Sequence, residues 1–335
     1  METQVLKKDQ LDTAVEFLRK GKLVAFPTET VYGLGALATD ERAVKAVYAA
    51  KGRPSDNPLI VTVSDAAMMS RFAREVPDRA KKLIDSFWPG PLTILLFVKP
   101  GSLPEAVTGG LDTVAFRCPD DSLTHELIAK LGEPIVGPSA NTSTKPSPTT
   151  AQHVFHDLKG KIAAIVDGGQ TEIGLESTIV DLSVKTPIVL RPGEITPEAL
   201  QKVLGETVLM NNGQAQTSGV PKAPGMKYRH YAPAAPVFIV DHPEDFKQIK
   251  FDDQTAFVAL DDVLSRLPNK IQSFSLGKNT DEAAHRLFEA LRYFDDRPQV
   301  KQIYVQGFTH GKICAAYMNR LNKAAGGHHL EPRVR

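Results

Sequence analysis

Short apolar runs alternate with helix-like stretches through most of the chain, and this alternation restricts the fold more than any other feature. Strand-like runs lie at residues 23–26, 59–63, 92–98, 113–116, 162–166, 178–182 and 188–190. Helical spacing of apolar residues occurs at residues 10–20, 40–48, 66–74, 79–87, 123–131, 151–156 and 197–204. Because such alternation is typical of layered α/β domains, we expect a twisted, largely buried sheet.

The pattern breaks between residues 211 and 236, where glycines and prolines replace periodic apolar residues. This segment is interpreted as a linker or a long functional loop. Strand-like runs resume at 237–240, 255–260 and 302–305, with an amphipathic helix at 283–294. We therefore predict three parts: a catalytic domain at 1–208, a linker or active-site lid at 209–235, and a small Rossmann-like α/β domain at 236–335.

Charge and cysteine content exclude several classes of protein. The 335 residues include 40 Lys and Arg against 39 Asp and Glu, so no global basic bias indicates nucleic-acid binding, although a local positive cleft is compatible with this balance. Cys118 and Cys314 are far apart and lack a CxxC neighbour, which argues against a cysteine zinc site. No run approaches the roughly 18 apolar residues of a membrane helix. We expect a cytoplasmic protein with no membrane association.

The first candidate site is the turn Lys51-Gly-Arg53-Pro-Ser-Asp-Asn57-Pro. Its two cations are two residues apart, and Asn57 adds an amide close by. Arg presents a planar fork to phosphate or carboxylate, whereas Lys supplies a compact charge. The same cations would also complement the C-terminus of the preceding helix. The prolines that stiffen the turn favour a site.

Two further polar clusters follow predicted strands. Pro27-Thr-Glu-Thr30-Val-Tyr-Gly33-Leu-Gly35 combines hydroxyls with close glycines, which suits a ligand lying against backbone. Its Gly33-x-Gly35 spacing matches a dinucleotide-binding pattern, but the required direct passage from strand to helix is missing. The cluster around Ser139 and Asn141 is rich in hydroxyls and amides, although an ordinary capped turn has the same composition.

Arginines end two of the predicted strands and strengthen the case for a cleft. Arg117 and Arg191 each occupy such a position, and Ser177 lies in another polar turn that enters a strand. Side chains at the carboxyl ends of strands commonly face the ligand in α/β proteins.

Taken in order, these segments resemble the YrdC-like proteins. The resemblance is carried by PTETVYGLG, KGRPSDNPL, GPSANTS, GLESTIVD and LRPGEIT. PGMKYRHYAP, followed by a small α/β domain, is similar to the two-domain form of the threonylcarbamoyl-AMP synthase family. The resemblance covers essentially the whole chain, and it implies a twisted α/β fold with a concave, basic active site.

The resemblance also implies a reaction. L-threonine, bicarbonate and ATP would give threonylcarbamoyl-AMP and pyrophosphate, which makes the expected enzyme a nucleotidyltransferase. Mg²⁺ would accompany ATP, with no tightly bound organic cofactor. Downstream threonylcarbamoyl transferase proteins would use the product to modify tRNA, while direct contact with tRNA would be weak or absent. Such chemistry depends on orientation and charge neutralisation more than on a protein nucleophile.

Site residues are carried over from the family position by position. The central tetrad comprises Lys51, Arg53, Ser139 and Asn141. L-threonine would be held by Thr30, Thr62, Arg117, Ser139 and Ser177, with Arg117 on its carboxylate. ATP would be held by Arg53, Asn57, Thr113, Asn141, Thr149, Arg191, Lys227, His230 and Tyr231.

One of the departures from the family pattern affects a threonine contact, and the main rival function is a different class of protein. Thr62 replaces a histidine that is usual in the family, so a shorter neutral side chain occupies one threonine contact. The rival is a factor that binds the backbone of double-stranded RNA with the same basic cleft. Its affinity would fall steeply with salt and would need neither threonine nor ATP.

Overall fold

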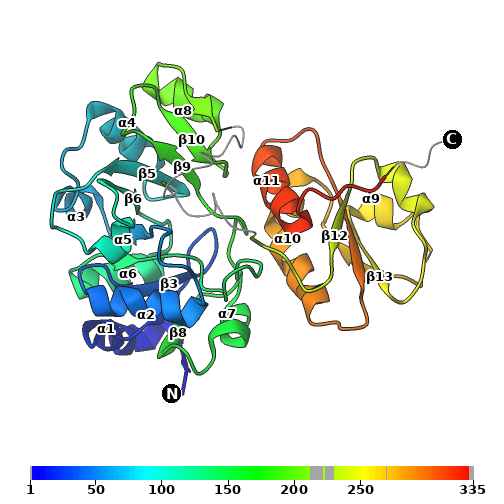
Figure 1. Cartoon of the computed structure of the whole chain (residues 1–335), viewed down its shortest axis with the longest axis horizontal. Coiled ribbons are helices and arrows are strands. Elements are labelled where there is room, and N and C mark those ends of the chain that lie inside the picture. Colours follow the sequence, from blue (N-terminus) through cyan, green and yellow to red (C-terminus); the bar gives the residue numbers. More distant parts are fainter. Residues whose placement is uncertain (1, 212–221, 223–229, 269, 332–335) are drawn as a thin grey trace. The chain divides into compact units, whose positions relative to one another are not determined.

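The computed structural model describes residues 2–211, 222, 230–268 and 270–331 (Figure 1). The chain forms two compact units. The first comprises Met1–Ser143, Pro148–Glu172 and Glu176–Lys227, and the second comprises Thr144–Ser147, Ile173–Leu175 and Tyr228–Arg335. Two short segments that interrupt the first unit in sequence therefore belong to the second. The boundaries predicted at residues 208 and 235 stay a prediction.

The first unit contains a mixed sheet whose described strands run in the order β1-β8-β2-β3-β7-β4-β6-β5-β9-β10-β11. Strands β4 and β6 are parallel, as are β5 and β9, whereas β5 and β6 are antiparallel. The strands are β1 (Gln4–Leu6), β2 (Val24–Phe26), β3 (Gly33–Leu37), β4 (Ile60–Thr62), β5 (Leu92–Phe97), β6 (Thr113–Arg117), β7 (Ile135–Val136), β8 (Ala164–Val166), β9 (Thr178–Asp181), β10 (Ile188–Arg191) and β11 (Leu209–Met210).

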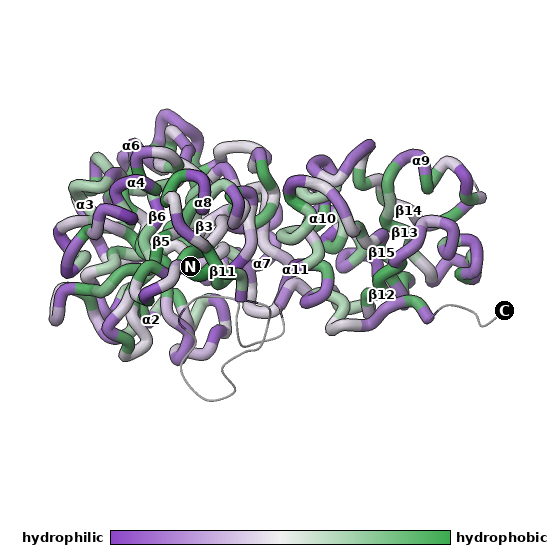
Figure 2. The backbone as a smooth tube through the Cα atoms, turned by 90° about the horizontal axis from the view of Figure 1, so that it is seen from above, coloured by the Kyte–Doolittle hydropathy of each residue, from purple (hydrophilic) through white to green (hydrophobic). Residues whose placement is uncertain are grey.

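Helices pack against the sheet and complete the core of this unit. Apolar faces of α1, α2, α4, α6, α7 and α8 all join one large buried cluster with the strands. Figure 2 shows hydrophobic stretches of the backbone gathered along the strands of this unit. The helices are η1 (Lys8–Gln10), α1 (Leu11–Arg19), α2 (Glu41–Lys51), α3 (Ala66–Ser70), α4 (Asp78–Phe87), α5 (Glu105–Thr108), α6 (Ser122–Leu131), α7 (Ala151–Leu158) and α8 (Pro197–Leu204).

The central strands β4, β6, β5 and β9 present two chemically different faces. One face, which includes Val61, Phe116 and Ile94, is part of the large core cluster. The alternate residues belong to a separate small apolar cluster, Ile60, Leu95, Ala115 and Ile179. Because side chains alternate along a strand, the residues in register with this second cluster lie on the face away from the main core. We call it the site face.

The second unit is built on a smaller sheet in which every described strand pair is parallel. Its order is β12-β15-β13-β14. Phe246, Phe257 and Val263 form part of one buried cluster, and Leu287 and Phe288 of α10 are fully buried. The elements are β12 (Val237–Val240), η2 (Pro243–Gln248), β13 (Thr255–Ala259), α9 (Asp261–Leu264), β14 (Gln272–Ser275), α10 (Thr280–Asp295), β15 (Gln302–Gln306) and α11 (Cys314–Ala325).

The expected α/β class is confirmed in both units. The sequence pattern missed β1, β3, β11 and β14, which are short or contain glycine. Gly33 and Gly35 lie in β3, where a Cβ would meet the Phe26 ring at 2.4 Å and the Val24 carbonyl oxygen at 2.8 Å respectively. These glycines therefore allow β3 to pack closely on β2. None of the described helices has the length and apolar character to cross a membrane.

Asp40 begins α2, the helix that carries Lys51. Its Oδ1 accepts hydrogen bonds from the N–H groups of Arg42 and Ala43 at 2.9 and 3.1 Å. We expect Asp40→Ala to lower the free energy of unfolding of the first unit by about 1 kcal/mol, the usual loss for an N-cap. Urea denaturation followed by far-UV circular dichroism measures this change. Asp40→Asn keeps the acceptor and should be nearly neutral; equal losses in both variants would contradict a capping role.

Candidate functional site

A row of side chains crosses the site face of the first unit. Thr62 of β4 and Thr93 of β5 each pair directly with Arg117 of β6. The row continues from Thr93 to Ile179 of β9 and then to Arg191 of β10. Residues paired in register project on the same side of a sheet. The fold therefore brings three of the predicted site residues into one line.

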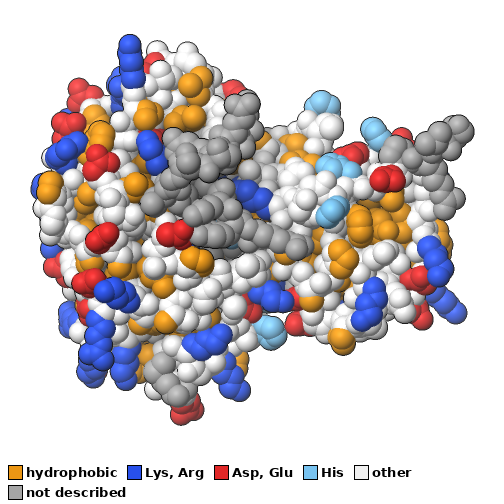
Figure 3. Space-filling view, viewed as in Figure 1, with side chains coloured by type: hydrophobic (Ala, Val, Ile, Leu, Met, Phe, Trp, Pro, Cys, Tyr) orange, Lys and Arg blue, Asp and Glu red, His pale blue; other side chains and the backbone are white. Residues whose placement is uncertain are grey.

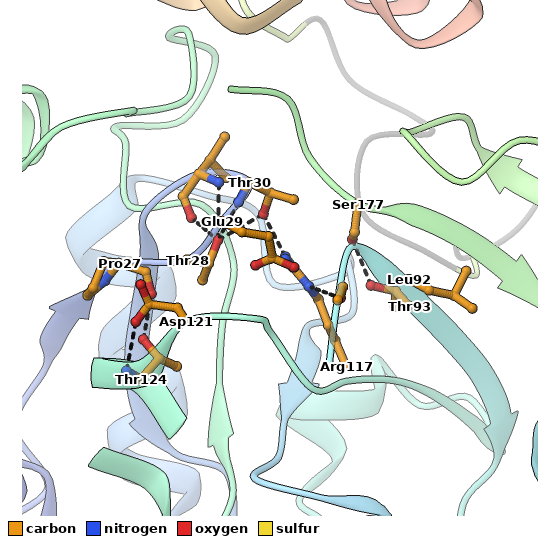
Figure 4. Close-up of polar contacts among 12 residues, drawn as sticks. Pro27, Thr28, Glu29, Thr30, Leu92, Thr93, Arg117, Asp121, Thr124 and Ser177 are labelled. Carbon is orange, nitrogen blue, oxygen red and sulfur yellow. Dashed lines mark hydrogen bonds and ion pairs between the residues drawn. The ribbon is translucent and has the colours of Figure 1, made fainter. Parts of the chain in front are cut away.

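Arg117 is the buried cation at the centre of this row. Its Nη2 donates to Glu29 Oε2 at 2.6 Å, and its Nη1 donates to Thr30 Oγ1 at 2.8 Å (Figure 4). A longer contact of 3.5 Å joins Nε to the Gly90 carbonyl. Arg117 is 8% exposed and Glu29 is 5% exposed. A charge buried to this extent is stable only when it is paired and hydrogen-bonded.

A tight turn presents Glu29 and Thr30 to Arg117. Thr28 Oγ1 accepts hydrogen bonds from the N–H groups of Thr30 and Val31 at 3.1 and 3.2 Å. It also lies 2.8 Å from Thr30 Oγ1. This local bonding of a hydroxyl to its own turn is typical of Ser/Thr turns. The Thr30 side chain therefore reaches Arg117 from a loop held in one conformation.

The same loop is tied to helix α6. Thr124 Oγ1 donates to the Pro27 carbonyl, and Asp121 accepts a hydrogen bond from the Thr124 N–H at 2.8 Å. Burial raises the pKa of the Asp121 carboxyl, and the nearby Glu29 charge adds to this effect. The Asp121 carboxyl is thus close enough to Glu29 for the two charges to interact (Figure 4).

Ser177 connects the row to β10. Its Oγ is 2.8 Å from Thr93 Oγ1 and accepts a hydrogen bond from Arg191 Nη2 at 3.1 Å. Arg191 Nε also donates to the Ser177 carbonyl at 3.0 Å. Ser177 is fully buried. The hydroxyl predicted at this position is therefore fixed between a threonine and an arginine.

Lys51, Ser139 and Asn141 form a second cluster. Lys51 Nζ donates to the carbonyls of Ser139 and Asn141, the latter at 2.7 Å, and lies 3.4 Å from Asn141 Oδ1. The segment around Ser139 pairs with the loop before β3, since the Ala140 N–H donates to the Tyr32 carbonyl at 2.8 Å. That loop spans residues 27–32, between β2 and β3, and includes Thr30. The second cluster and the Arg117 row are therefore joined through one short stretch of chain.

Arg53 closes the turn between α2 and β4. Its Nη2 donates to the carbonyls of Asn57 and Pro58 at 3.1 and 3.0 Å, and its guanidinium lies 5.9 Å from the centre of the Tyr48 ring. Asn57 is 1% exposed, and its Oδ1 accepts no hydrogen bond from the described residues. The turn thus carries a cation and a buried amide oxygen in fixed positions.

Thr113 and Thr149 are the remaining residues of this unit that are predicted to contact ATP. Thr113 begins β6 and shares the face of Arg117, four residues away, at a separation of roughly 13 Å. The small apolar cluster around Ala115 lies between them. Thr149 is buried, and its Oγ1 is 3.3 Å from His153 Nδ1. The site face therefore has an apolar centre with polar groups on both sides.

Three residues predicted to contact ATP lie outside the described part of the first unit, and their role stays a prediction. Lys227 lies outside the described residues. His230 and Tyr231 fall in the second unit, where the Tyr231 ring is 5.0 Å from that of Phe288. Of the chain between residues 212 and 229, only Lys222 is described. It lies in the first unit and pairs with the buried Asp181 at 3.1 Å.

Two polar side chains of this arrangement, Thr93 and Glu29, are not predicted from the sequence. Thr93 lies in an apolar run that predicts only a buried strand, although it is the one hydroxyl in the strand 92–97. Glu29 lies in a hydroxyl-rich turn, and the sequence pattern predicts no role for it. A lone acidic residue between two threonines, in a segment otherwise suited to burial, is the signal that could have indicated a buried charge.

Comparison with known proteins agrees with this architecture. Residues 16–193 match a family model described as Telomere recombination, which groups Sua5, YciO and YrdC proteins, and residues 195–326 match the threonylcarbamoyl-AMP synthase C-terminal domain. The threonylcarbamoyl-AMP synthase of Pyrococcus abyssi is 46% identical over 93% of both chains. That of Bacillus subtilis is 44% identical, over 95% of this chain and 93% of the relative.

A solved structure extends the likeness to the fold. The crystal structure of P. abyssi Sua5 complexed with L-threonine superimposes with a TM-score of 0.89 and 41% identity, over 98% of this chain and 99% of that one. The fold and site thus define a YrdC-like α/β protein with an added C-terminal domain. The chain belongs to the threonylcarbamoyl-AMP synthase family.

The Thr93–Ser177 contact is testable by itself. We expect Thr93→Val, which keeps the shape and removes the hydroxyl, to lower the free energy of unfolding by about 1 kcal/mol, as for one buried hydrogen bond. Chemical denaturation of the full chain measures this loss. Thr93→Ser retains the hydroxyl and should keep the hydrogen bond. The only loss of stability expected in this variant is that caused by the missing methyl group. If valine is tolerated better than serine, the contact contributes nothing.

Proposed function

We propose that this protein is an L-threonylcarbamoyladenylate synthase. The amine of L-threonine takes up bicarbonate with loss of water, and a carbamate oxygen then attacks the α-phosphorus of ATP. Pyrophosphate leaves, and threonylcarbamoyl-AMP remains. The enzyme is accordingly a nucleotidyltransferase, and its product would pass to threonylcarbamoyl transferase proteins that modify tRNA. Direct binding of tRNA by this chain would be weak or absent.

The observation that carries this proposal is the polar row on the site face. Arg117 offers a guanidinium at the position where the substrate carboxylate would bind, because planar guanidinium groups recognise carboxylates well. Thr30 and Thr62 lie beside it, and Ser177 is held further along the row by Thr93. These groups form a small polar site suited to an amino acid that carries a hydroxyl. We assign Ser139 to the same subsite.

ATP would lie across the site face toward Thr113. Lys51 ends α2 and Arg53 lies two residues later, and both would neutralise phosphate charge as it develops. Asn57, Asn141, Thr149 and Arg191 complete the proposed contacts. The small apolar cluster between Thr113 and Arg117 provides a surface against which an adenine ring could lie. We also propose that Lys227, His230 and Tyr231 contact ATP.

Mg²⁺ would arrive with ATP as its counter-ion. Among the described residues, no group of three or more His, Cys, Asp or Glu side chains could hold a metal ion, so we assign the ion to the triphosphate. Burial raises the pKa of the Cys118 thiol to about 12, which makes this neighbour of Arg117 a poor nucleophile at neutral pH. Catalysis would instead rest on positioning. We further propose that no organic cofactor is needed and that the enzyme works in the cytoplasm.

Purified protein should release pyrophosphate from MgATP only when L-threonine and bicarbonate are both present. The physical reason is that the carbamate is the nucleophile and forms from both. A coupled pyrophosphate assay measures the rate, and mass spectrometry identifies the adenylate. The control omits each substrate in turn.

The absence of pyrophosphate release under every combination would reject the synthase reaction. The rival function as a binder of double-stranded RNA is favoured by no feature of the described residues. Figure 3 shows Lys and Arg side chains interspersed with Asp and Glu on the face in view. Salt-sensitive binding of double-stranded RNA, together with a lack of synthase activity, would support the rival function.

Arg53→Ala should weaken ATP binding by about 10- to 100-fold, the range expected when one charge-assisted hydrogen bond is lost. Isothermal titration calorimetry measures the dissociation constant, and circular dichroism tests whether the fold is intact. Arg42→Ala is a matched control, because Arg42 is exposed on the same helix α2. An ATP affinity that stays the same in Arg53→Ala would remove Arg53 from the site.

A further inference from the structure

Glu29 has a buried oxygen that the Arg117 ion pair does not use. Oε2 accepts the hydrogen bond from Arg117, whereas Oε1 accepts none from the described residues. The Glu29 side chain is 4% exposed. A buried carboxylate oxygen without a donor is energetically unfavourable, and native structures seldom retain one without a reason. Oε1 therefore indicates a missing hydrogen-bond donor.

Within the described part of the chain, Arg117 has unused hydrogen-bond donors, which complement the unused acceptor of Glu29. A guanidinium carries five N–H groups, two on each terminal nitrogen and one on Nε. Among the described residues, Nη1 donates to Thr30, Nη2 donates to Glu29, and Nε makes the long contact with Gly90. One N–H on each terminal nitrogen is left for another acceptor. The pair is thus neutral as a whole, with spare donors on one partner and a spare acceptor on the other.

This complementarity specifies the charge pattern of a ligand. A carboxylate alone would add a negative charge beside Glu29, and an amine alone would add a positive charge beside Arg117. A zwitterion adds no net charge and matches both partners. The distance between the two charges of an α-amino acid is short, as is the 2.6 Å contact between Arg117 and Glu29.

We propose that Glu29 is a specificity-determining residue that accepts a hydrogen bond from the α-ammonium group of the substrate through Oε1. Together, Glu29 and Arg117 select a zwitterionic α-amino acid over a hydroxy acid of the same shape. This inference rests on the proposed function, because it takes L-threonine as the ligand. Glu29 acts on the zwitterion before the amine loses its proton.

The test compares two ligands in the full-length protein without ATP or bicarbonate. L-threonine and (R)-3-hydroxybutyrate share the carboxylate and the hydroxyl, but only threonine has the amine. Dissociation constants are measured by NMR titration for the wild type, Glu29→Gln, Glu29→Asp and Asp121→Asn. Asp121→Asn is the matched control, because Asp121 is a neighbouring carboxyl that caps the N-terminus of α6. Circular dichroism establishes that each variant is folded.

We expect Glu29→Gln to bind L-threonine at least about tenfold more weakly, as for the loss of a charged hydrogen-bond partner. The same change should leave 3-hydroxybutyrate binding unchanged or tighter, because it removes a negative charge next to the ligand carboxylate. Asp121→Asn should keep the wild-type ratio of the two affinities. Glu29→Asp, which retains the charge, should bind threonine better than Glu29→Gln.

Three results would overturn the inference. The first is a Glu29→Gln protein that loses affinity for both ligands equally, since Glu29 would then only position Arg117. The second is an unchanged threonine affinity, and the third is a wild type that does not prefer threonine over the hydroxy acid. If Glu29→Gln does not fold, Glu29→Asp and the wild-type preference decide the matter. Because no turnover is involved, a missing pyrophosphate signal would reject the synthase reaction and leave these affinities valid.

Discussion

The charge of Arg117 lies inside the first unit, and the geometry of the candidate site follows from the need to pair it. An isolated charge at such a position would destabilise the fold by several kcal/mol. Glu29 and Thr30 provide the pairing from a loop far away in sequence. The loop is consequently held against the end of β6, and its turn is fixed by Thr28. One ion pair thereby joins the end of β6 to this loop.

The two faces of the central strands separate stability from binding. Val61, Phe116 and Ile94 pack into the main core, and their hydrophobic burial supports the fold. The alternate residues support the row of Thr62, Arg117 and Thr93. Because adjacent residues of a strand point in opposite directions, a rigid core directly underlies the polar row. This arrangement suits a site that acts by positioning substrates, since small displacements weaken such catalysis.

Particular residues show how far prediction from sequence reached. Lys51, Ser139 and Asn141 were grouped by family resemblance, and they are in direct contact in the structure. Arg117 and Arg191 were expected at strand ends, and both are found there. Thr93 and Glu29 were not identified, because their partners are 84 and 88 residues away along the chain. Periodicity reports on neighbours in sequence and contains no information on such distant contacts.

The sequence by itself determined the α/β class, most of the helices and strands, and the family. Those properties follow from local spacing of apolar residues, from capping residues such as Asp40, and from ordered motifs. Only the tertiary structure decided which strands are neighbours, and therefore that Thr62, Arg117 and Thr93 form one row. It alone revealed the pairing of Arg117 with Glu29 and the unused oxygen of that carboxylate. Strand order and buried pairing depend on the packing of the whole unit, which no local pattern encodes.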